Sequence, residues 1–376
     1  MAATTLSDSI MPRVALAGYY EAGNFGDDLS AVLFGLALRR CGIPFSVYGL
    51  CEPYAQRFGF DRAASPDELL AGADALVWGG GGLLVSWASM TYRLLYRSAA
   101  SRLGALVDAA AARATPVLLA SVGGDGRPIG TLTPAYKERL VAAACSVTVR
   151  NPQDVDILKA RGQHAAFFPD IVWGLSRVMP IERRRGARLR VGFDLYPSNL
   201  VRQGALQLLP RLQAAVRRRQ DCDFVFIDTT NASRKHYRGL GGIIRGANVS
   251  RYQFRDPDAD LAFLASLDAV FSSRLHVPVV AMQYGVPAVS VFAERKTRLL
   301  YANLGLEGLS FHQGRIGELL SLIGSREGLD RLTREFPFPD AERLGRESLG
   351  HVDVLREALG KAVRPAPADG RDEGDA

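Results

Sequence analysis

The stretch Ala75-Leu-Val-Trp-Gly-Gly-Gly-Gly82 contains the pattern that decides the fold, a short apolar run that stops at glycine. The same pattern occurs at Arg13-Val-Ala-Leu-Ala-Gly18 and at Pro116-Val-Leu-Leu-Ala-Ser-Val-Gly-Gly124. Continuous apolar runs of this length are typical of buried strands in a parallel sheet. Patterns expected of helices lie around and between these runs, over residues 29–41, 66–72 and 92–113. Strands that alternate with helices predict a doubly wound α/β sheet.

The alternation restarts after a basic segment, Pro180-Ile-Glu-Arg-Arg-Arg-Gly-Ala-Arg188, which has the composition of an interdomain linker. Further strands are expected at 189–194, 224–228, 269–272 and 288–292, and further helices at 201–219, 257–267 and 277–285. We therefore expect two α/β domains, 12–180 and 181–340, that face each other across a cleft. A helical segment at 341–363 is expected to pack back on the N-terminal domain. Residues 364–376 lack apolar periodicity and are expected to form a disordered tail.

The composition of the 376-residue chain, 48% hydrophobic and 23% charged, is typical of a soluble globular protein. Lys and Arg outnumber Asp and Glu, 46 to 39, which gives a formal charge of +7. This excess suits a phosphorylated small substrate or an anionic membrane surface equally well. The arginine groups at 183–190 and 217–219 are local and not interleaved with aromatic residues, so we expect no nucleic-acid partner.

The cysteines and the apolar runs indicate the compartment. The four cysteines are scattered without a CxxC pair, which favours a reducing compartment and excludes a structural zinc site of the usual spacing. The first residues lack the features of a signal peptide, and no run approaches the roughly 20 apolar residues of a spanning helix. We expect a cytoplasmic protein that at most contacts the inner face of the membrane.

Glycine-rich loops follow two of the expected strands, at the sheet edge where α/β proteins bind ligands. The loop Gly18 to Asp28 has neither a GxGxxG nor a GK[ST] pattern, so neither a nicotinamide cofactor nor a P-loop is indicated. It is equally well explained as an anion-binding turn or as a turn capped by Asn24 and Asp27. The four glycines Gly79, Gly80, Gly81 and Gly82 lose much backbone entropy on folding, and we favour a pocket floor or anion nest over a close helix–strand crossing.

The segment Ser272-Ser-Arg-Leu-His276 comes directly after another expected strand. Arg274 offers a fork that matches phosphate or carboxylate, and His276 can exchange a proton near neutral pH. Lys296 follows the next strand end, where it is either a ligand for an anion or part of a solvated charged turn. The acidic run Asp256-Pro-Asp-Ala-Asp260 is expected to cap a helix rather than to bind a metal.

Taken together, several short motifs resemble the polysaccharide pyruvyl transferase family from about Val14 to about Leu306. They are Gly23-Asn-Phe-Gly-Asp27, Gly79-Gly-Gly-Gly82, Ser121-Val-Gly123, Ser273-Arg-Leu-His276, Gly285-Val-Pro287, and Lys296 followed by Leu304-Gly-Leu306. Their order and distances carry the resemblance. It implies two Rossmann-like domains similar to B-type glycosyltransferases, and transfer of pyruvate from phosphoenolpyruvate to a sugar, which forms a cyclic ketal. No residue pattern demands a metal, and we expect no cofactor beyond this co-substrate.

The implied reaction assigns roles to the candidate residues as hypotheses. His276 would be the general acid or base, and Arg274 would clamp the anionic groups of the donor. Lys296 would neutralise the leaving phosphate, and Ser273 would help to bind the donor. Asn24 and the backbone of Gly79 to Gly82 would line the donor or acceptor pocket. Asp27 or Asp170 would orient sugar hydroxyls.

Two other functions compete with this interpretation. A B-type glycosyltransferase with a nucleotide-sugar donor would use Arg274 and Lys296 on a diphosphate. A non-catalytic, lectin-like protein could keep the fold, but it would have little reason to retain Arg274, His276 and Lys296 together. The expected acceptor is a polysaccharide or lipid-linked oligosaccharide of bacterial exopolysaccharide or cell-surface glycan biosynthesis. The arginines around the linker are explained either as helix-end and surface charge or as contacts to anionic lipids that present this acceptor.

Overall fold

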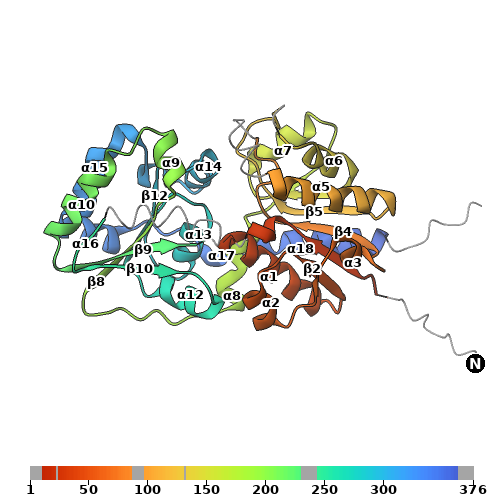
Figure 1. Ribbon diagram of the computed structural model, residues 1–376, viewed down its shortest axis with the longest axis horizontal. Coiled ribbons are helices and arrows are strands. Elements are labelled where there is room, and N and C mark those ends of the chain that lie inside the picture. Colours follow the sequence, from red (N-terminus) through yellow and green to blue (C-terminus); the bar gives the residue numbers. More distant parts are fainter. Residues whose placement is uncertain (1–10, 23, 87–96, 131–132, 230–243, 363–376) are drawn as a thin grey trace, which may run out of the picture.

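A computed structural model describes residues 11–22, 24–86, 97–130, 133–229 and 244–362 of the chain (Figure 1). These residues form two α/β domains, each built on a fully parallel sheet. The N-terminal sheet has seven strands in the order β3-β2-β1-β4-β5-β6-β7, and the C-terminal sheet has six in the order β10-β9-β8-β11-β12-β13. The predicted tail 364–376 lies outside the described residues.

The N-terminal domain contains the first seven strands. They are β1 (Val14–Ala17), β2 (Phe45–Tyr48), β3 (Arg62–Ala63), β4 (Ala75–Gly79), β5 (Val117–Val122), β6 (Ala144–Val149) and β7 (Ala166–Phe167). The described helices of this half are η1 (Tyr19–Ala22), α1 (Phe25–Arg40), α2 (Glu52–Phe58), α3 (Pro66–Leu70), α5 (Arg97–Ala112), α6 (Ala135–Ala143), α7 (Pro152–Lys159), η2 (Ile171–Gly174) and α8 (Leu175–Val178).

The C-terminal domain repeats this alternation. Its strands are β8 (Leu189–Asp194), β9 (Cys222–Asp228), β10 (Val249–Gln253), β11 (Ala269–Ser272), β12 (Ala288–Val291) and β13 (Ser310–Phe311). Its described helices are α9 (Pro197–Arg202), α10 (Leu208–Arg218), α12 (Pro257–Ala265), α13 (His276–Gln283), α14 (Arg295–Asn303), η3 (Glu307–Leu309), η4 (Gln313–Arg315), α15 (Ile316–Gly324) and α16 (Arg326–Glu335). Two final helices, α17 (Ala341–Ser348) and α18 (Gly350–Ala362), end the described chain.

The three apolar runs that stop at glycine are confirmed as the central strands β1, β4 and β5, which lie side by side. All residues of these strands are buried, because helices cover both faces of the sheet. The direction of strand order reverses between β1 and β4 in the first sheet and between β8 and β11 in the second. Ligands of doubly wound sheets bind at the carboxyl ends of the strands beside such a reversal. The loops after β1, β4, β8 and β11 are therefore where a site is expected.

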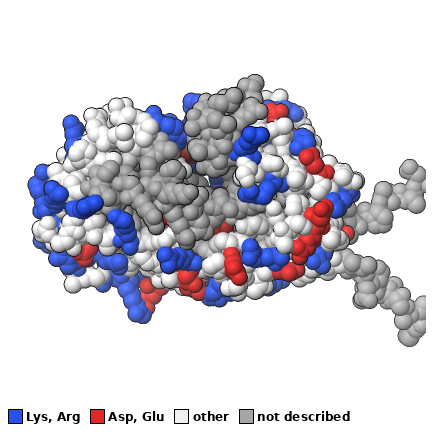
Figure 2. All heavy atoms as spheres, in the orientation of Figure 1, with Lys and Arg blue, Asp and Glu red and all other residues white. Residues whose placement is uncertain are grey.

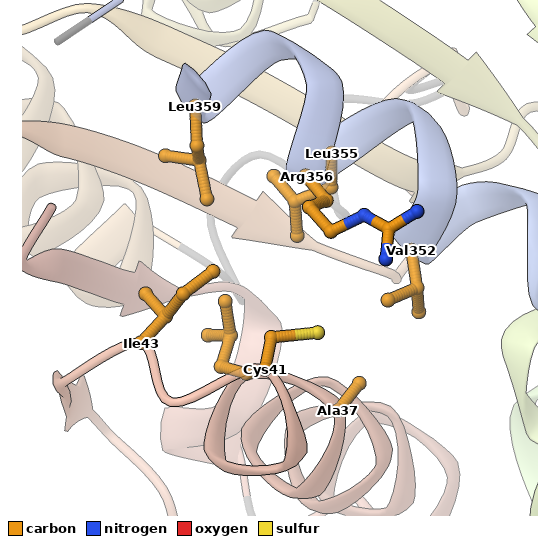
Figure 3. A pocket seen from close by; sticks show the side chains of 8 residues that line it. Ala37, Cys41, Ile43, Val352, Leu355, Arg356 and Leu359 are labelled. Atoms are coloured by element: carbon orange, nitrogen blue, oxygen red, sulfur yellow. The ribbon is translucent and has the colours of Figure 1, made fainter. Parts of the chain in front are cut away.

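The last two helices return to the N-terminal domain. Helix α17 packs on η2, and α18 contacts β5 and β6 (Figure 1). Helix α18 also faces the end of α1, where a small groove lies between Leu355 and Leu359 on one side and Ala37 and Ile43 on the other (Figure 3). The polypeptide thus crosses between the domains twice, once through the irregular segment before β8 and once before α17.

Some helix boundaries differ from those predicted. The expected helix 201–219 is two helices, α9 and α10, because Gly204 takes a left-handed conformation with φ of 63° between them. The expected helical segment at 341–363 is also two helices, divided at Leu349. Helix α1 begins at Phe25, four residues before the predicted start. The predicted helix start at Asp256-Pro257 is confirmed, with the Asp256 carboxylate accepting from the Ala259 amide.

Candidate active site

The start of α1 joins the two domains at the carboxyl ends of their sheets. The Phe25 amide donates a hydrogen bond of 3.2 Å to the carbonyl of Thr229, which follows β9. The Phe25 ring lies edge-on to Phe254 of the C-terminal domain, with 4.6 Å between the ring centroids. The loops that carry the predicted site residues of both domains therefore meet here.

His276, the first residue of α13, lies directly over Gly26 of α1. A Cβ atom at Gly26 would lie 1.7 Å from His276 Nδ1 and 2.1 Å from Cγ, so only glycine permits this contact. The imidazole is buried, with 7% of the residue exposed. Position 26 is therefore glycine because His276 of the other domain packs directly against it.

The other ring nitrogen of His276 contacts a buried ion pair. His276 Nε2 lies 3.0 Å from Arg150 Nη1 and 3.3 Å from Asp170 Oδ2, and these two groups are 2.6 Å apart. Burial alone would raise the pKa of the Asp170 carboxyl, but the charge of Arg150 and the hydrogen bond with His276 hold it well below its usual value. A neutral His276 can accept from Arg150, and a protonated one can donate to Asp170. Nε2 makes one of these two hydrogen bonds at a time, according to the tautomer of the ring.

Arg274 reaches from the loop after β11 to the first loop of the other domain. Its Nη1 lies 3.5 Å from Asn24 Oδ1, and its guanidinium lies 4.7 Å from the centroid of the Tyr196 ring. Asn24 in turn donates to Asp27 Oδ2 at 2.6 Å. Asn24 occupies the N-cap position of α1 without capping it through its side chain, so the amide serves this polar chain instead. Arg274, Asn24 and Asp27 form a continuous polar strip next to the His276–Gly26 contact.

Gly79, the last residue of β4, and the three glycines after it allow close packing and two unusual backbone conformations. Gly80 and Gly81 have φ of 75° and 81°, which other residues rarely adopt. A Cβ at Gly80 would lie 2.8 Å from Ser30 of α1, so the close helix–strand crossing is real. The Gly123 amide donates to the Gly81 carbonyl at 3.0 Å, which joins this loop to the loop after β5. Arg150 covers Gly123, where a Cβ would lie 2.4 Å from its Nε.

Lys137 of α6 forms hydrogen bonds with the end of the Gly79–Gly82 loop. Its buried ammonium donates to the carbonyls of Gly82 and Val85, at 3.2 and 3.1 Å, and lies 5.6 Å from the centroid of the Tyr19 ring. Burial, and to a lesser extent the charge of Lys296, lowers the pKa of Lys137 to about 7. Lysines from the two domains are thus near enough to repel each other, an arrangement that an anion would stabilise.

A second bridge joins the domains beside these lysines. Arg295, at the start of α14, donates to the carbonyl of Asp125 at 2.8 Å, and Asn303 at the end of that helix pairs with Gln153 of α7 at 2.9 Å. Helices α7 and α14 face each other here (Figure 1). Lys296 is held next to this bridge by an ion pair of 3.3 Å with Glu294. The candidate site is therefore flanked by interdomain contacts on two sides.

A family model for polysaccharide pyruvyl transferases matches residues 24–293, which include the family motifs named above except Gly23 and the segment around Lys296 and Leu304–Leu306. The chain belongs to this family. It is therefore an enzyme, as the three strand-end residues Arg274, His276 and Lys296 predict. A sequence search among curated proteins gives no match.

Solved structures with the same fold bind nucleotide sugars. A UDP-GlcNAc 2-epimerase from Methanocaldococcus jannaschii, in complex with UDP-GlcNAc and UDP, has a TM-score of 0.60 at 9% identity, over 92% of this chain and all of that one. The enzyme of the same name from Neisseria meningitidis, bound to UDP-GlcNAc, has a TM-score of 0.56 at 11% identity, over the same shares. Such low identity concerns the fold alone, and the predicted arrangement similar to B-type glycosyltransferases is confirmed.

The structure brings most of the predicted residues to the contact between the domains, with two qualifications. The Ser273 hydroxyl accepts from the Tyr196 amide and donates to the Asp194 carbonyl, so it braces the C-terminal domain. Both oxygens of Asp170 are used by protein groups, since Oδ1 accepts from the Val172 amide, which places this carboxylate behind His276. The roles in donor and acceptor binding stay predictions.

Two site residues escaped the sequence analysis. Arg150 directly follows β6, a strand that was not predicted because Ala144-Cys-Ser-Val-Thr-Val149 is not continuously apolar. Lys137 offers no such signal, because it lies within helix α6 among other charged residues and only the tertiary structure buries it.

The part of the chain that the structure describes contains neither a metal-ligating cluster nor a helix that could span a bilayer. No three His, Cys, Asp or Glu side chains gather there as a metal site would require. A search of the described helices for a segment able to span a bilayer likewise found none.

Proposed function

We propose that this enzyme transfers pyruvate from phosphoenolpyruvate to a sugar of a polysaccharide or lipid-linked oligosaccharide, forming a cyclic ketal, in bacterial exopolysaccharide or cell-surface glycan biosynthesis. The observation that carries the proposal is the presence of basic side chains from both domains along the interdomain contact, with Arg150 Nη1 3.0 Å from the buried His276 Nε2. Arg150 and Lys137 come from the N-terminal domain, and Arg274 and Lys296 from the C-terminal domain. Phosphoenolpyruvate carries a carboxylate and a phosphate on one small framework, so it needs cations on two sides.

The reaction requires one proton donor and two attacking hydroxyls. His276 protonates the methylene carbon of phosphoenolpyruvate, which becomes the methyl group and leaves the central carbon electrophilic. Two hydroxyl oxygens of one sugar attack that carbon in turn, and its bond to the phosphate oxygen breaks. One hydroxyl proton returns to His276 and the other leaves with the phosphate, so the enzyme is regenerated and hydrogen phosphate is released. No cofactor is needed.

The polar residues supply the remaining functions in this proposal. Arg274 binds the donor carboxylate, and Lys296 neutralises the leaving phosphate. Arg150 and Asp170 hold the His276 ring in place. Asn24 and Asp27 receive the sugar, and the backbone of the Gly79–Gly82 loop lines the donor or acceptor pocket.

The proposal is tested by incubating the purified enzyme with phosphoenolpyruvate and a panel of lipid-linked or nitrophenyl sugars. Phosphate release that depends on the sugar, together with the mass gain of a pyruvyl ketal on it, supports the proposal. His276→Ala should lower turnover about 100-fold or more, since general acid–base catalysis contributes 10²–10⁴-fold. A folded His276→Ala enzyme that keeps its turnover would show that this residue is not the acid or base.

A nucleotide-sugar donor is the alternative, favoured by what the structural neighbours bind. The same assay decides between the two donors when UDP-sugars replace phosphoenolpyruvate. If the acceptor gains the mass of a hexose without phosphoenolpyruvate, the enzyme is a glycosyltransferase and the proposed pyruvyl transfer is wrong.

We further propose that the enzyme works in the cytoplasm and contacts the anionic inner face of the membrane. Arg183 does not take part, because it donates to the carbonyls of Gly285 and Leu267. The side chains of Arg184 and Arg185 are 87% and 59% exposed. Basic side chains are also frequent along the outer edge of the C-terminal domain, at the left of Figure 2.

Sedimentation with anionic and neutral vesicles at low and high salt tests the membrane contact. Binding should require anionic lipid, fall at high salt and weaken in Arg184→Gln/Arg185→Gln. The variant Lys159→Gln, which changes an exposed lysine of the N-terminal domain, is the control. Equal recovery with neutral vesicles would refute the electrostatic contact.

A further inference from the structure

The start of α18 is fitted to the segment that carries Asp170. A Cβ atom at Gly350 would lie 2.2 Å from the Phe168 ring, so the helix can approach this segment only with glycine there. The next residue, His351, is fully buried, and its ring lies edge-on to Phe168 at a centroid distance of 5.3 Å. The C-terminal helix thus contacts the residues just before Asp170 through both of its first two positions.

His351 uses both ring nitrogens. Nδ1 lies 2.7 Å from Thr148 Oγ1, and Nε2 lies 3.0 Å from the carbonyl of Pro169. A carbonyl only accepts, so Nε2 carries the hydrogen. The Thr148 hydroxyl accepts from the Ser121 amide at 3.0 Å and donates to Nδ1. Burial, in addition, lowers the pKa of His351 to about 4, so one neutral tautomer is fixed.

Both partners of His351 lie next to the ion pair behind His276. Thr148 is two residues before Arg150 on β6, and Pro169 directly precedes Asp170. The side chain of His351 therefore connects the segment that leads to Arg150 with the segment that leads to Asp170. Arg150 Nη1 and Asp170 Oδ2 are 2.6 Å apart, and both contact His276 Nε2. Ser121 belongs to the same network, because its hydroxyl accepts from the Ile171 amide at 3.1 Å.

We propose that His351 is a positioning residue for the active site. From the C-terminal helix it fixes the separation of the Arg150 and Asp170 segments, and so the orientation of His276. The residue lies outside the part of the chain that the family model matches. The inference rests on the proposed function only in taking His276 as the acid or base.

Three variants test this role at a temperature well below unfolding. His351→Leu removes both hydrogen bonds, whereas His351→Gln can still donate to the Pro169 carbonyl from near the position of Nε2. Leu355→Ala is the matched control, because Leu355 is a buried residue of α18 that faces α1 instead. We expect kcat to fall about 10- to 100-fold in His351→Leu, to be partly restored in His351→Gln, and to stay within about twofold in the control. A wild-type kcat in folded His351→Leu would overturn the proposal.

A spectroscopic measurement makes the test independent of activity. The chain has five histidines, so ¹⁵N-labelled histidine gives few ring signals. His351 should show a protonated Nε2 and an unprotonated Nδ1 at pH 7. The Nε2 signal of His276 should shift in both His351 variants and stay unchanged in Leu355→Ala. An unchanged His276 signal in His351→Gln would overturn the proposal even if His351→Leu fails to fold. If wild type does not turn over phosphoenolpyruvate, the proposed function fails while this measurement still decides the positioning role.

Discussion

Replacing Lys137 with methionine should change the pH dependence of stability. The ammonium is buried and donates to the carbonyls of Gly82 and Val85, and its pKa falls from 10.5 to about 7. Between these two values the unfolded chain holds a proton on Lys137 that the folded chain has lost. Because the unfolded state then binds more protons, the free energy of unfolding rises with pH across this range.

The size of the effect follows from the two pKa values. Each pH unit inside the range contributes up to about 1.4 kcal/mol. Integrated from pH 7.5 to pH 9.5, the gain from Lys137 is about 2.5 kcal/mol, since the unfolded group begins to lose its own proton near the upper limit. The methionine side chain does not titrate, so the difference in unfolding free energy between wild type and Lys137→Met should change by this amount.

Urea unfolding followed by tryptophan fluorescence is a suitable assay. All three tryptophans, Trp78, Trp87 and Trp173, lie in the N-terminal half of the sequence, so the signal reports the domain that contains Lys137. Lys159→Met, at an exposed position of the same domain, controls for loss of a surface lysine. Parallel stability curves for wild type and Lys137→Met between pH 7.5 and 9.5 would refute the reasoning.

Three further predictions concern the site. Gly26→Ala should lower activity about 100-fold, because its Cβ would occupy the place of His276 Nδ1; Gly317→Ala, where a Cβ meets nothing within 4 Å, should leave activity unchanged in the same assay. Arg150→Met should lower the free energy of unfolding in urea by about 3–5 kcal/mol, because Asp170 is left buried without its cation. Adding Asp170→Asn should recover part of this loss. Arg150→Met as stable as wild type would contradict a stabilising buried pair. When phosphoenolpyruvate binds at pH 8, the enzyme should take up protons, because an anion favours the charged form of Lys137. Calorimetry in buffers of different ionisation enthalpy measures this uptake. Uptake that persists in Lys137→Met would mean that another group binds the proton.

The sequence predicted the fold because its signals are local. A strand buried on both faces must be apolar throughout, and it must end where the chain turns, so the glycine-terminated runs at β1, β4 and β5 could be found without knowing their neighbours. The same rule found the loops with Asn24, Arg274 and His276, since a strand end is a place along the chain. It did not find Arg150, because the strand before it, Ala144–Val149, is not a continuous apolar run and is only partly buried at its start.

Other features depend on which segments meet in space. Nothing near Lys137 in the sequence distinguishes it from a surface lysine, and its burial results from the packing of α6 under the glycine loop. The pairing of Gly26 with His276 joins positions 250 residues apart, and it exists only because the two domains dock through the start of α1. His351 acts on the site only because the last helix returns to the first domain. From the sequence alone, the strands with a continuous apolar pattern and the loops after them can be located, since burial on both faces requires that pattern. Only the tertiary structure decided which side chains of those loops and helices touch, because that depends on strand order and on domain docking.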